Sequence, residues 1–233
     1  MDFSPKIFIV GVGPGDPELL TLRAARVLAH CETILHPGPR DDAGFAFEVV
    51  ARLLQPRQVV RGMGLAMRRG PDDGSVGYDR VAKALLAEWR AGRSSAFLTE
   101  GDPLLFGTGS YVVDQLRALA PEIDAEIVPG VSSISAAAAR LGWPLAQKAE
   151  ILTICPATYH ADGLAAILDR PGPICLLKAA AILPTLIAEL KARGRLADAA
   201  LVEKVGRPDE RIFRDLERVP GEGLSYFSLV LVR

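Results

Sequence analysis

The amino-acid sequence predicts an α/β fold with a mainly parallel sheet in its N-terminal part. Short apolar runs recur along the chain, Gly and Pro end most of them, and stretches with helical periodicity separate one run from the next. Strands that alternate with helices are typical of βαβ units, in which the helix returns the chain so that successive strands run parallel. The chain has 233 residues, which is enough for one large domain or two smaller ones.

The N-terminal elements follow from this pattern. Residues 6–12 (KIFIVGV) form an expected buried strand that Gly13 and Pro14 end. Thr21 is an expected N-cap of a helix through residue 29, because its hydroxyl can accept a bond from a free backbone N–H. The other strands expected here are 33–35, 58–61, 95–99 and 124–128, and the other helices are 45–54, 78–91 and 108–119.

The C-terminal part predicts a second α/β domain with a mixed sheet. Its expected strands are 151–155, 174–178, 199–204, 211–214 and 226–232, and its expected helices are 130–141, 164–168 and 182–191. The last two strands are close in sequence, which favours an antiparallel arrangement. We place the domain boundary so that the first domain covers residues 1–122 and the second covers residues 123–233.

Composition disfavours several functional classes. The chain carries 27 Lys and Arg against 28 Asp and Glu, a net charge of −1, whereas nucleic-acid and anionic-membrane surfaces need clustered positive charge. No apolar run reaches the ~20 residues of a transmembrane helix, so we expect no membrane association. Three widely spaced cysteines match neither a disulfide framework nor a zinc motif, which favours the cytoplasm.

Three loops that each follow an expected strand hold the residues we expect at a ligand site. They are residues 11–17 (GVGPGDP), 100–103 (EGDP) and 129–133 (PGVSS). Ligands of open α/β sheets bind beyond the carboxyl ends of the strands, so all three loops could line one crevice. Glycine, which has no Cβ, would let the backbone approach a ligand closely. Each loop taken alone is equally consistent with Gly and Pro residues that merely end a strand.

The first loop does not fit a dinucleotide-binding fingerprint. The pattern G-x-G-x-x-G requires a third glycine where Asp16 stands, and an aspartate there would repel a pyrophosphate. The phosphate-binding pattern G-x-x-x-x-G-K-[ST] does not occur either. Dehydrogenase and kinase functions are therefore disfavoured.

In this order and at this spacing, the segments GVGPGDPELLT, EGDPLLFGTGSY and IVPGVSSISAAAARLG resemble the signature motifs of the tetrapyrrole methylases. The resemblance continues through LVEKVGRPDERIFRDL and YFSLVLV, so it covers nearly the whole chain. It implies two α/β domains with the active site in the cleft between them, and a homodimer. It also implies S-adenosylmethionine as methyl donor, S-adenosylhomocysteine as product, and a small-molecule tetrapyrrole as substrate.

The resemblance also implies which residues contact the adenosylmethionine, carried over position by position. In the three loops these are Pro14, Glu100, Gly101, Asp102, Leu105, Ser132 and Ser133. In the second domain they are Ala179 and Val205, where the family more often has glycine or methionine.

Finer features resemble the members that methylate precorrin-2 or cobalt-factor II at carbon 20. Pro37 ends the second strand, where the siroheme-type methylases have a Tyr-Asp pair whose Asp is their proposed base. The segment from Arg207 and the closing YFSLVLV agree with the carbon-20 type, whereas Leu105-Phe106-Gly107 departs from it. Three alternatives stay open: methylation at another carbon, binding without catalysis, and a diphthine-type methylase. The sequence leaves open whether the substrate carries cobalt.

The chemistry of such a substrate points to further residues. Asp16 and His36 are hypothetical acceptors of the proton that leaves carbon 20. The loop residues Arg40, Arg68, Arg69 and Arg207 are hypothetical partners of substrate carboxylates, which guanidinium groups bind in a bidentate manner. The plainer alternatives are that His36 packs a loop and that the arginines are solvated surface charges. No spacing of His and carboxylate residues indicates a metal site.

Overall fold

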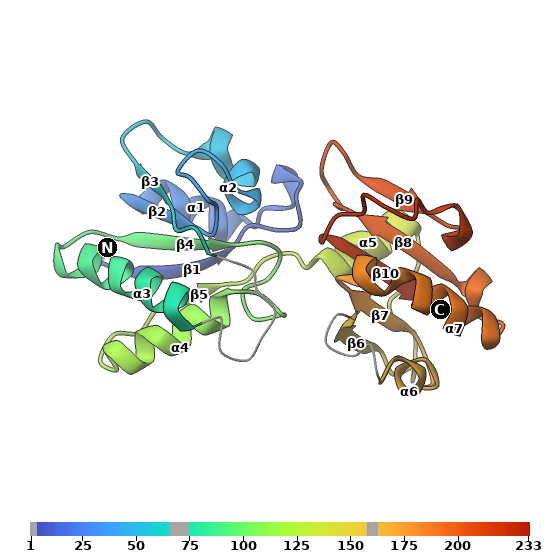
Figure 1. The fold of residues 1–233 in the computed structure, drawn as a ribbon. Coiled ribbons are helices and arrows are strands. Elements are labelled where there is room, and N and C mark those ends of the chain that lie inside the picture. Colours follow the sequence, from blue (N-terminus) through green and yellow to red (C-terminus); the bar gives the residue numbers. More distant parts are fainter. Residues whose placement is uncertain (1–3, 66–74, 158–162) are drawn as a thin grey trace. The chain divides into compact units, whose positions relative to one another are not determined.

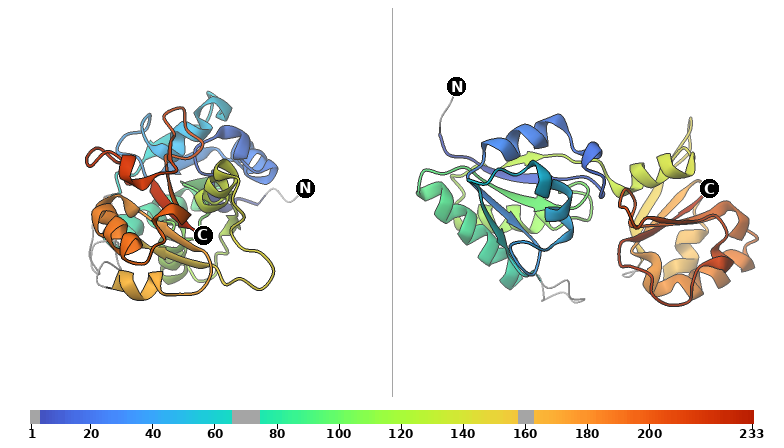
Figure 2. Two further views of the ribbon diagram at one scale, coloured as in Figure 1. Left: turned by 90° about the vertical axis from the view of Figure 1, so that its right-hand side faces the viewer. Right: turned by 90° about the horizontal axis from the view of Figure 1, so that it is seen from above.

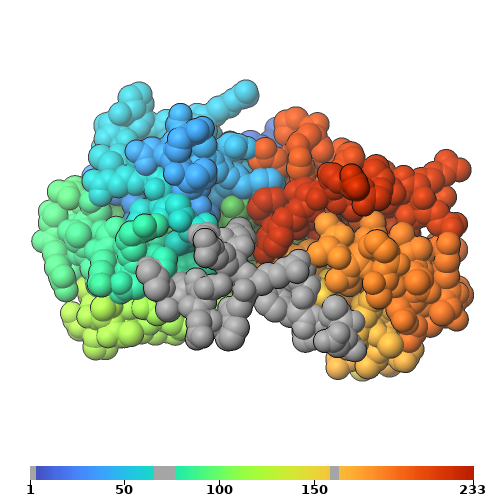
Figure 3. All heavy atoms as spheres, viewed as in Figure 1, coloured from blue at the N-terminus to red at the C-terminus, as the bar shows by residue number. Residues whose placement is uncertain are grey.

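The computed structural model describes residues 4–65, 75–157 and 163–233. The chain divides into two compact units, Met1–Ser132 and Ser133–Arg233 (Figure 1). In the space-filling view, the first unit is coloured from blue to green and the second from yellow to red (Figure 3).

In the described part of the first unit, five parallel strands form one sheet in the order β3-β2-β4-β1-β5. The strands are β1 (Ile7–Gly11), β2 (Thr33–His36), β3 (Val59–Gly62), β4 (Ser95–Thr99) and β5 (Glu126–Val128). The predicted parallel sheet is therefore confirmed. All of its strands end at the same edge.

Helices cover both faces of this sheet (Figure 2). The helices are α1 (Leu22–His30), α2 (Phe45–Val50), α3 (Ser75–Arg90) and α4 (Gly109–Leu119), with short 3-10 turns η1 (Pro17–Leu19) and η2 (Ala51–Leu53). Apolar residues of α1 and α2 pack on one face, and those of α3 and α4 pack on the other. Thr21 caps α1 as predicted, because its hydroxyl accepts a hydrogen bond from Ala24 N at 3.1 Å.

The division between the units lies later in the chain than the predicted boundary after residue 122. The reason is β5, which pairs with β1 in parallel and so completes the first sheet. Phe8 stands opposite Glu126, and Val10 stands opposite Val128. The residues of β5 therefore belong to the first unit, which ends at Ser132.

In the described part of the second unit, five strands form a mixed sheet in the order β6-β7-β10-β8-β9. The strands are β6 (Thr153–Pro156), β7 (Ile174–Leu177), β8 (Ala199–Glu203), β9 (Arg211–Phe213) and β10 (Ser228–Val232). Its helices are α5 (Ser133–Leu141), α6 (Leu164–Leu168) and α7 (Leu183–Ala192), with 3-10 turns η5 (Ala179–Ile182), η6 (Leu196–Asp198) and η7 (Leu216–Arg218). The predicted mixed sheet is confirmed.

The expectation that the last two strands run antiparallel to each other is wrong. β8 lies between them and pairs antiparallel with both, so β9 and β10 run in the same direction. Burial explains this order. Every residue of β10 is buried, so the strand lies inside the sheet between β7 and β8, whereas the partly exposed β9 forms the edge. An apolar run such as 228–232 gains more from a central position, where both of its faces are covered.

The three cysteines, Cys31, Cys155 and Cys175, are buried and free. Burial, together with the nearby Glu32, raises the pKa of the Cys31 thiol to about 12. They are small apolar core residues in this fold. Among the described residues, no helix has the length and apolar character needed to cross a membrane.

Candidate functional site

The three motif loops meet at one edge of the first sheet. β4, β1 and β5 are neighbours in the sheet and parallel, so their carboxyl ends lie side by side. The loops 11–17, 100–103 and 129–133 leave from these ends. This is the edge at which open α/β sheets bind ligands.

Backbone hydrogen bonds join the first loop to the second. Gly101 N donates to Gly13 O at 2.8 Å, and Gly13 N donates to Gly101 O at 3.3 Å. A side chain joins the second loop to the third, because the Asp102 carboxylate accepts from Gly130 N at 3.2 Å and from Leu104 N at 2.9 Å. Asp102 therefore holds two loops in register.

The glycines of these loops serve loop-to-loop packing. A Cβ on Gly11 would lie 2.6 Å from Gly101 O and 2.7 Å from Gly130 N. A Cβ on Gly130 would lie 2.9 Å from Gly11 Cα, and it would lie even closer to Gly101 O. Such distances leave no room for a side chain. The sequence interpretation assigned this freedom to contact with a ligand, whereas the structure uses it between the loops themselves.

Other predicted cofactor residues lie around this junction. Pro14 is buried in the first loop, and Ser132 and Ser133 are half-buried at the start of α5. Leu105 is 38% exposed beside the exposed Leu104 and Phe106. The site therefore offers hydroxyls, accessible apolar surface and backbone groups together.

Glu100 stands at the end of β4, and its carboxyl group accepts a hydrogen bond from the backbone N–H of Ala46 in α2. Part of the residue reaches the surface, yet protein atoms surround the carboxyl group closely. This burial raises the pKa of Glu100 above its ordinary value, and the backbone hydrogen bonds oppose the shift only in part.

His36 is fully buried at the end of β2, and both of its ring nitrogens are engaged. Nδ1 accepts from Gly38 N at 3.1 Å, and Nε2 lies 3.1 Å from Asp41 O, to which it donates. The ring stacks on Phe47 with centroids 5.1 Å apart. Burial lowers the pKa of His36, and the hydrogen bond to Asp41 opposes this. The geometry supports the alternative in which His36 packs a loop.

Asp16 caps the short turn η1. Its side chain accepts from Glu18 N at 2.9 Å, and the residue is partly exposed. Its carboxylate therefore remains accessible at the first motif loop.

In the second unit, Ala179 and Val205 lie two residues after the ends of β7 and β8, and both are buried. β7 and β8 are both antiparallel to β10, so their carboxyl ends lie at the same edge. Because both side chains point into the protein, only the backbone near Ala179 and Val205 is available to a ligand. The residues before them, Lys178 and Lys204, have left-handed backbone with φ of 60° and 50°.

The predicted substrate arginines are placed differently from one another. Arg40 is exposed and pairs weakly with the exposed Asp42. Arg207 is mostly buried and lies 3.5 Å from a carboxylate oxygen of Asp209. Arg68 and Arg69 lie outside the described residues.

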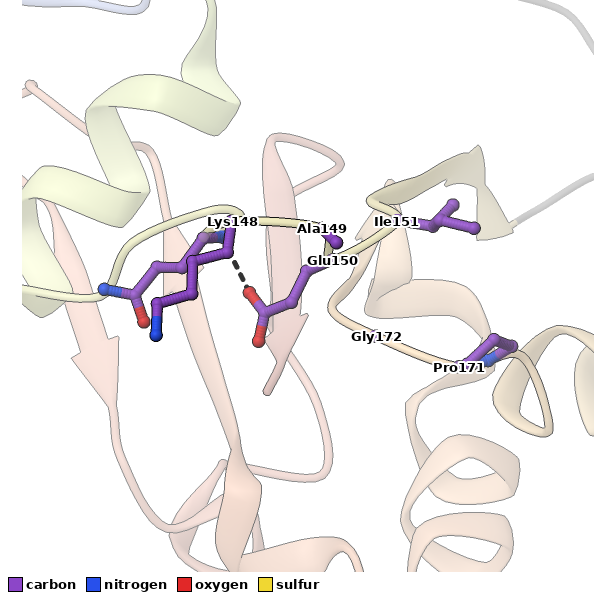
Figure 4. Close-up of a pocket in the computed structure, with 7 residues that line it drawn as sticks. Lys148, Ala149, Glu150, Ile151, Pro171 and Gly172 are labelled. Atoms are coloured by element: carbon purple, nitrogen blue, oxygen red, sulfur yellow. Dashed lines mark hydrogen bonds between the residues drawn. The ribbon is translucent and has the colours of Figure 1, made fainter.

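A shallow open hollow lies at the opposite edge of the second sheet, beside the start of β6 (Figure 4). Its lining residues are Gln147, Lys148, Ala149, Glu150, Ile151, Pro171 and Gly172. The dashed bond in the figure holds the turn together, since Gln147 N donates to Glu150 Oε2 at 2.8 Å. The hollow contains none of the predicted site residues. Within the described parts of the chain, no group of His, Cys, Asp and Glu is arranged to hold a metal ion.

A model of the tetrapyrrole (corrin/porphyrin) methylases matches residues 6–219, which include all three motif loops and both sheet edges. The chain belongs to this family. The predicted family and fold are therefore confirmed.

Curated relatives of this tetrapyrrole methylase match over nearly their full length. Cobalt-precorrin-2 C(20)-methyltransferase of Salmonella typhimurium is 32% identical over 97% of this chain and 95% of its own. Precorrin-2 C(20)-methyltransferase of a Sinorhizobium species is 33% identical over 96% of this chain and 93% of its own. Among solved structures, a uroporphyrin-III C-methyltransferase of Thermus thermophilus is 30% identical, with a TM-score of 0.70 over 98% of this chain and 92% of that one.

Two further residues of this methylase, Lys178 and Tyr226, are not among the predicted site residues. The Lys178 ammonium lies over the Tyr226 ring, 5.1 Å from its centroid, although the residues are far apart in the chain. A lysine directly after the apolar run ICLL is a visible signal. Neither the left-handed backbone nor the aromatic neighbour can be read from it.

Proposed function

We propose that this chain transfers the methyl group of S-adenosylmethionine to carbon 20 of precorrin-2 or of its cobalt form, in cobalamin biosynthesis. The observation that carries the proposal is the junction of the three motif loops at the carboxyl edge of the first sheet. The two full-length relatives named for this activity support the choice of substrate. Pro37, at the position where siroheme-type methylases have a Tyr-Asp pair, supports it further.

The residues around the junction fit the cofactor by their chemistry. The hydroxyls of Ser132 and Ser133 suit its polar groups, and the accessible surface of Leu105 suits an apolar ring. Ala179 and Val205 remain proposed cofactor residues through their backbone groups, because both side chains are buried. When bound, S-adenosylmethionine supplies an already electrophilic methyl group. The chain's own work is to orient the two ligands and to exclude water.

Asp16 is the better supported of the two proposed proton acceptors. Its carboxylate is partly exposed at the first motif loop, whereas both nitrogens of His36 are engaged inside the protein. Arg40 remains a proposed partner of substrate carboxylates because its guanidinium is largely exposed.

The test is anaerobic incubation of the purified protein with S-adenosylmethionine and precorrin-2, with and without inserted cobalt, followed by mass spectrometry. A gain of one methyl group on either substrate is expected. The substrate that reacts tells whether the enzyme acts on metal-free precorrin-2 or on its cobalt form. Reaction only with a later corrin intermediate would show methylation at another carbon. Tight binding of S-adenosylhomocysteine without any transfer would show a binding protein and contradict the proposed activity.

We further propose that the enzyme is a cytoplasmic homodimer. The segment 104–111 exposes the apolar side chains of Leu104, Phe106 and Tyr111, and such surface favours association. Light scattering of the purified protein measures the mass directly. A monomer at micromolar concentration would contradict the dimer.

A further inference from the structure

Two lysines of the second unit share an unusual backbone conformation at the same sheet edge. Lys178 follows β7 with φ of 60°, and Lys204 follows β8 with φ of 50°. Left-handed backbone is unfavourable for residues with a side chain and persists where the surroundings enforce it. Here, hydrogen bonds to residues at the start of β10 hold the backbone of both lysines in place. Ala180 N donates to the Ser228 hydroxyl at 3.0 Å, and Lys204 N donates to Phe227 O at 2.7 Å.

The charge of Lys204 is already neutralised. Its ammonium lies 2.6 Å from a carboxylate oxygen of Asp209, whose other oxygen is 3.5 Å from Arg207. Lys204 and Arg207 together hold the pKa of Asp209 below its ordinary value. Lys204 therefore belongs to a local ion-pair cluster.

Lys178 has a different environment. Its ammonium lies over the ring of Tyr226, which is 43% exposed and packs edge-on against Phe227 at 5.5 Å. Among the described residues, no carboxylate forms an ion pair with Lys178. An aromatic face orients an ammonium without cancelling its charge, so Lys178 can still bind an anion.

We propose that Lys178, oriented by the ring of Tyr226, binds a carboxylate group of a small molecule held at this edge of the second unit. The inference rests on the proposed function, because both ligands of that reaction carry carboxylates: the side chains of the tetrapyrrole and the methionine part of the cofactor. The location agrees, since Lys178 directly precedes Ala179, one of the proposed cofactor residues. Backbone constraint at Lys178 fixes where the side chain begins, which reduces the entropy lost on binding.

Lys178→Gln removes the charge and keeps much of the side-chain length. Lys148→Gln is the matched control, because Lys148 is also left-handed, with φ of 51°, and lies at the opposite edge of the same sheet (Figure 4). Lys178→Arg restores a positive charge. Melting temperatures of all three variants establish that each one folds.

Two binding titrations identify the source of the carboxylate. Calorimetry compares the affinity for S-adenosylhomocysteine with the affinity for its decarboxylated analogue. Fluorescence quenching measures the affinity for uroporphyrin in the presence of S-adenosylhomocysteine. We expect K178Q to bind one of the carboxylated ligands about tenfold more weakly than the wild type, which is the usual order for loss of a charge-assisted hydrogen bond. We expect K178R to recover this affinity. Weaker uroporphyrin binding assigns the site to the tetrapyrrole. Weaker S-adenosylhomocysteine binding, with the decarboxylated analogue unaffected, assigns it to the cofactor.

The proposal is overturned if K178Q binds both carboxylated ligands as the wild type does, or if K148Q weakens them equally. It is also overturned if K178Q weakens the decarboxylated analogue as much as S-adenosylhomocysteine, since the effect then does not depend on a carboxylate. These titrations need no turnover. A wild-type protein that binds both ligands but transfers no methyl group would refute the proposed function and leave the Lys178 site intact.

Discussion

The Asp102 carboxylate accepts a hydrogen bond from the backbone N–H of Gly130 at 3.2 Å, across 28 residues of sequence. Its other oxygen accepts from Leu104 N at 2.9 Å, which fixes the turn after β4. One aspartate thus sets the shape of one motif loop and anchors the next one. A charged acceptor with two backbone donors is stronger than a neutral pair.

Asp102→Ala should therefore act through loop geometry. Loss of the two bonds leaves N–H groups without their acceptor, and we expect about 1–2 kcal/mol less stability together with weaker S-adenosylhomocysteine binding. Urea unfolding and calorimetry measure the two effects. Asp114→Ala is the control, because Asp114 makes only a long, exposed pair with Arg117. Unchanged S-adenosylhomocysteine binding in D102A would contradict the proposal that Asp102 supports cofactor binding by anchoring the loops.

Gly130→Ala should separate the two loops that meet at this residue. The added Cβ would lie 2.9 Å from Gly11 Cα, and backbone cannot move aside as a flexible side chain can. Overpacking of this kind costs about 1–3 kcal/mol, and the shifted loops should bind S-adenosylhomocysteine more weakly. Gly221→Ala is the matched control, since a Cβ there meets nothing within 4 Å. Equal stability of the two variants would contradict the close packing.

His36→Asn should lower stability more than it lowers the rate of methyl transfer per folded molecule. The neutral ring is buried and bonded at both nitrogens, so the folded state resists protonation and the pKa is lowered. The contribution of His36 to stability is complete above its ordinary pKa of about 6.5 and is lost as pH falls below it. The wild type should therefore lose stability on acidification in this range more steeply than the variant. A stable variant with a greatly reduced turnover rate would instead support His36 as the proton acceptor.

Glu100→Gln should stabilise the protein, and more at pH 8 than at pH 5. Burial raises the pKa of the Glu100 carboxyl. In the unfolded chain this group has an ordinary pKa of about 4.3, so there is a pH range in which the unfolded chain has lost the proton and the folded state still holds it. The unfolded state then binds fewer protons, and stability falls as pH rises through the folded pKa. Gln keeps an oxygen for Ala46 N and cannot ionise. Melting temperatures across this range test the prediction, and parallel curves for the two proteins would contradict it.

The local sequence pattern was enough to predict those features that depend on one element or on one contiguous segment. Thr21 caps α1 as predicted because the capping bond joins residues three apart in the chain. The parallel first sheet follows from alternating strands and helices, since each crossover constrains the direction of the next strand. The family also follows from sequence alone, because its motifs are contiguous segments.

Other features depend on partners that are distant in the chain. The first unit extends to Ser132 because β5 pairs with β1, and nothing within residues 124–128 shows this pairing. The direction of β9 relative to β10 depends on β8 between them. The role of Gly130 depends on Gly11 and Gly101, which approach it only in the folded protein.

By itself, the sequence determined the fold class, the three motif loops and the family, because periodicity, capping and contiguous motifs are local properties. Only the tertiary structure decided that Asp102 anchors Gly130, that His36 is engaged at both nitrogens, and that Lys178 lies over Tyr226 while Lys204 is paired. Asp102 and Lys178 meet partners that are distant in the chain, so only the packing of the whole chain brings these groups together. The partners of His36 and Lys204 lie two to five residues away, and the loop conformation that the folded protein imposes decides whether these groups come within bonding distance.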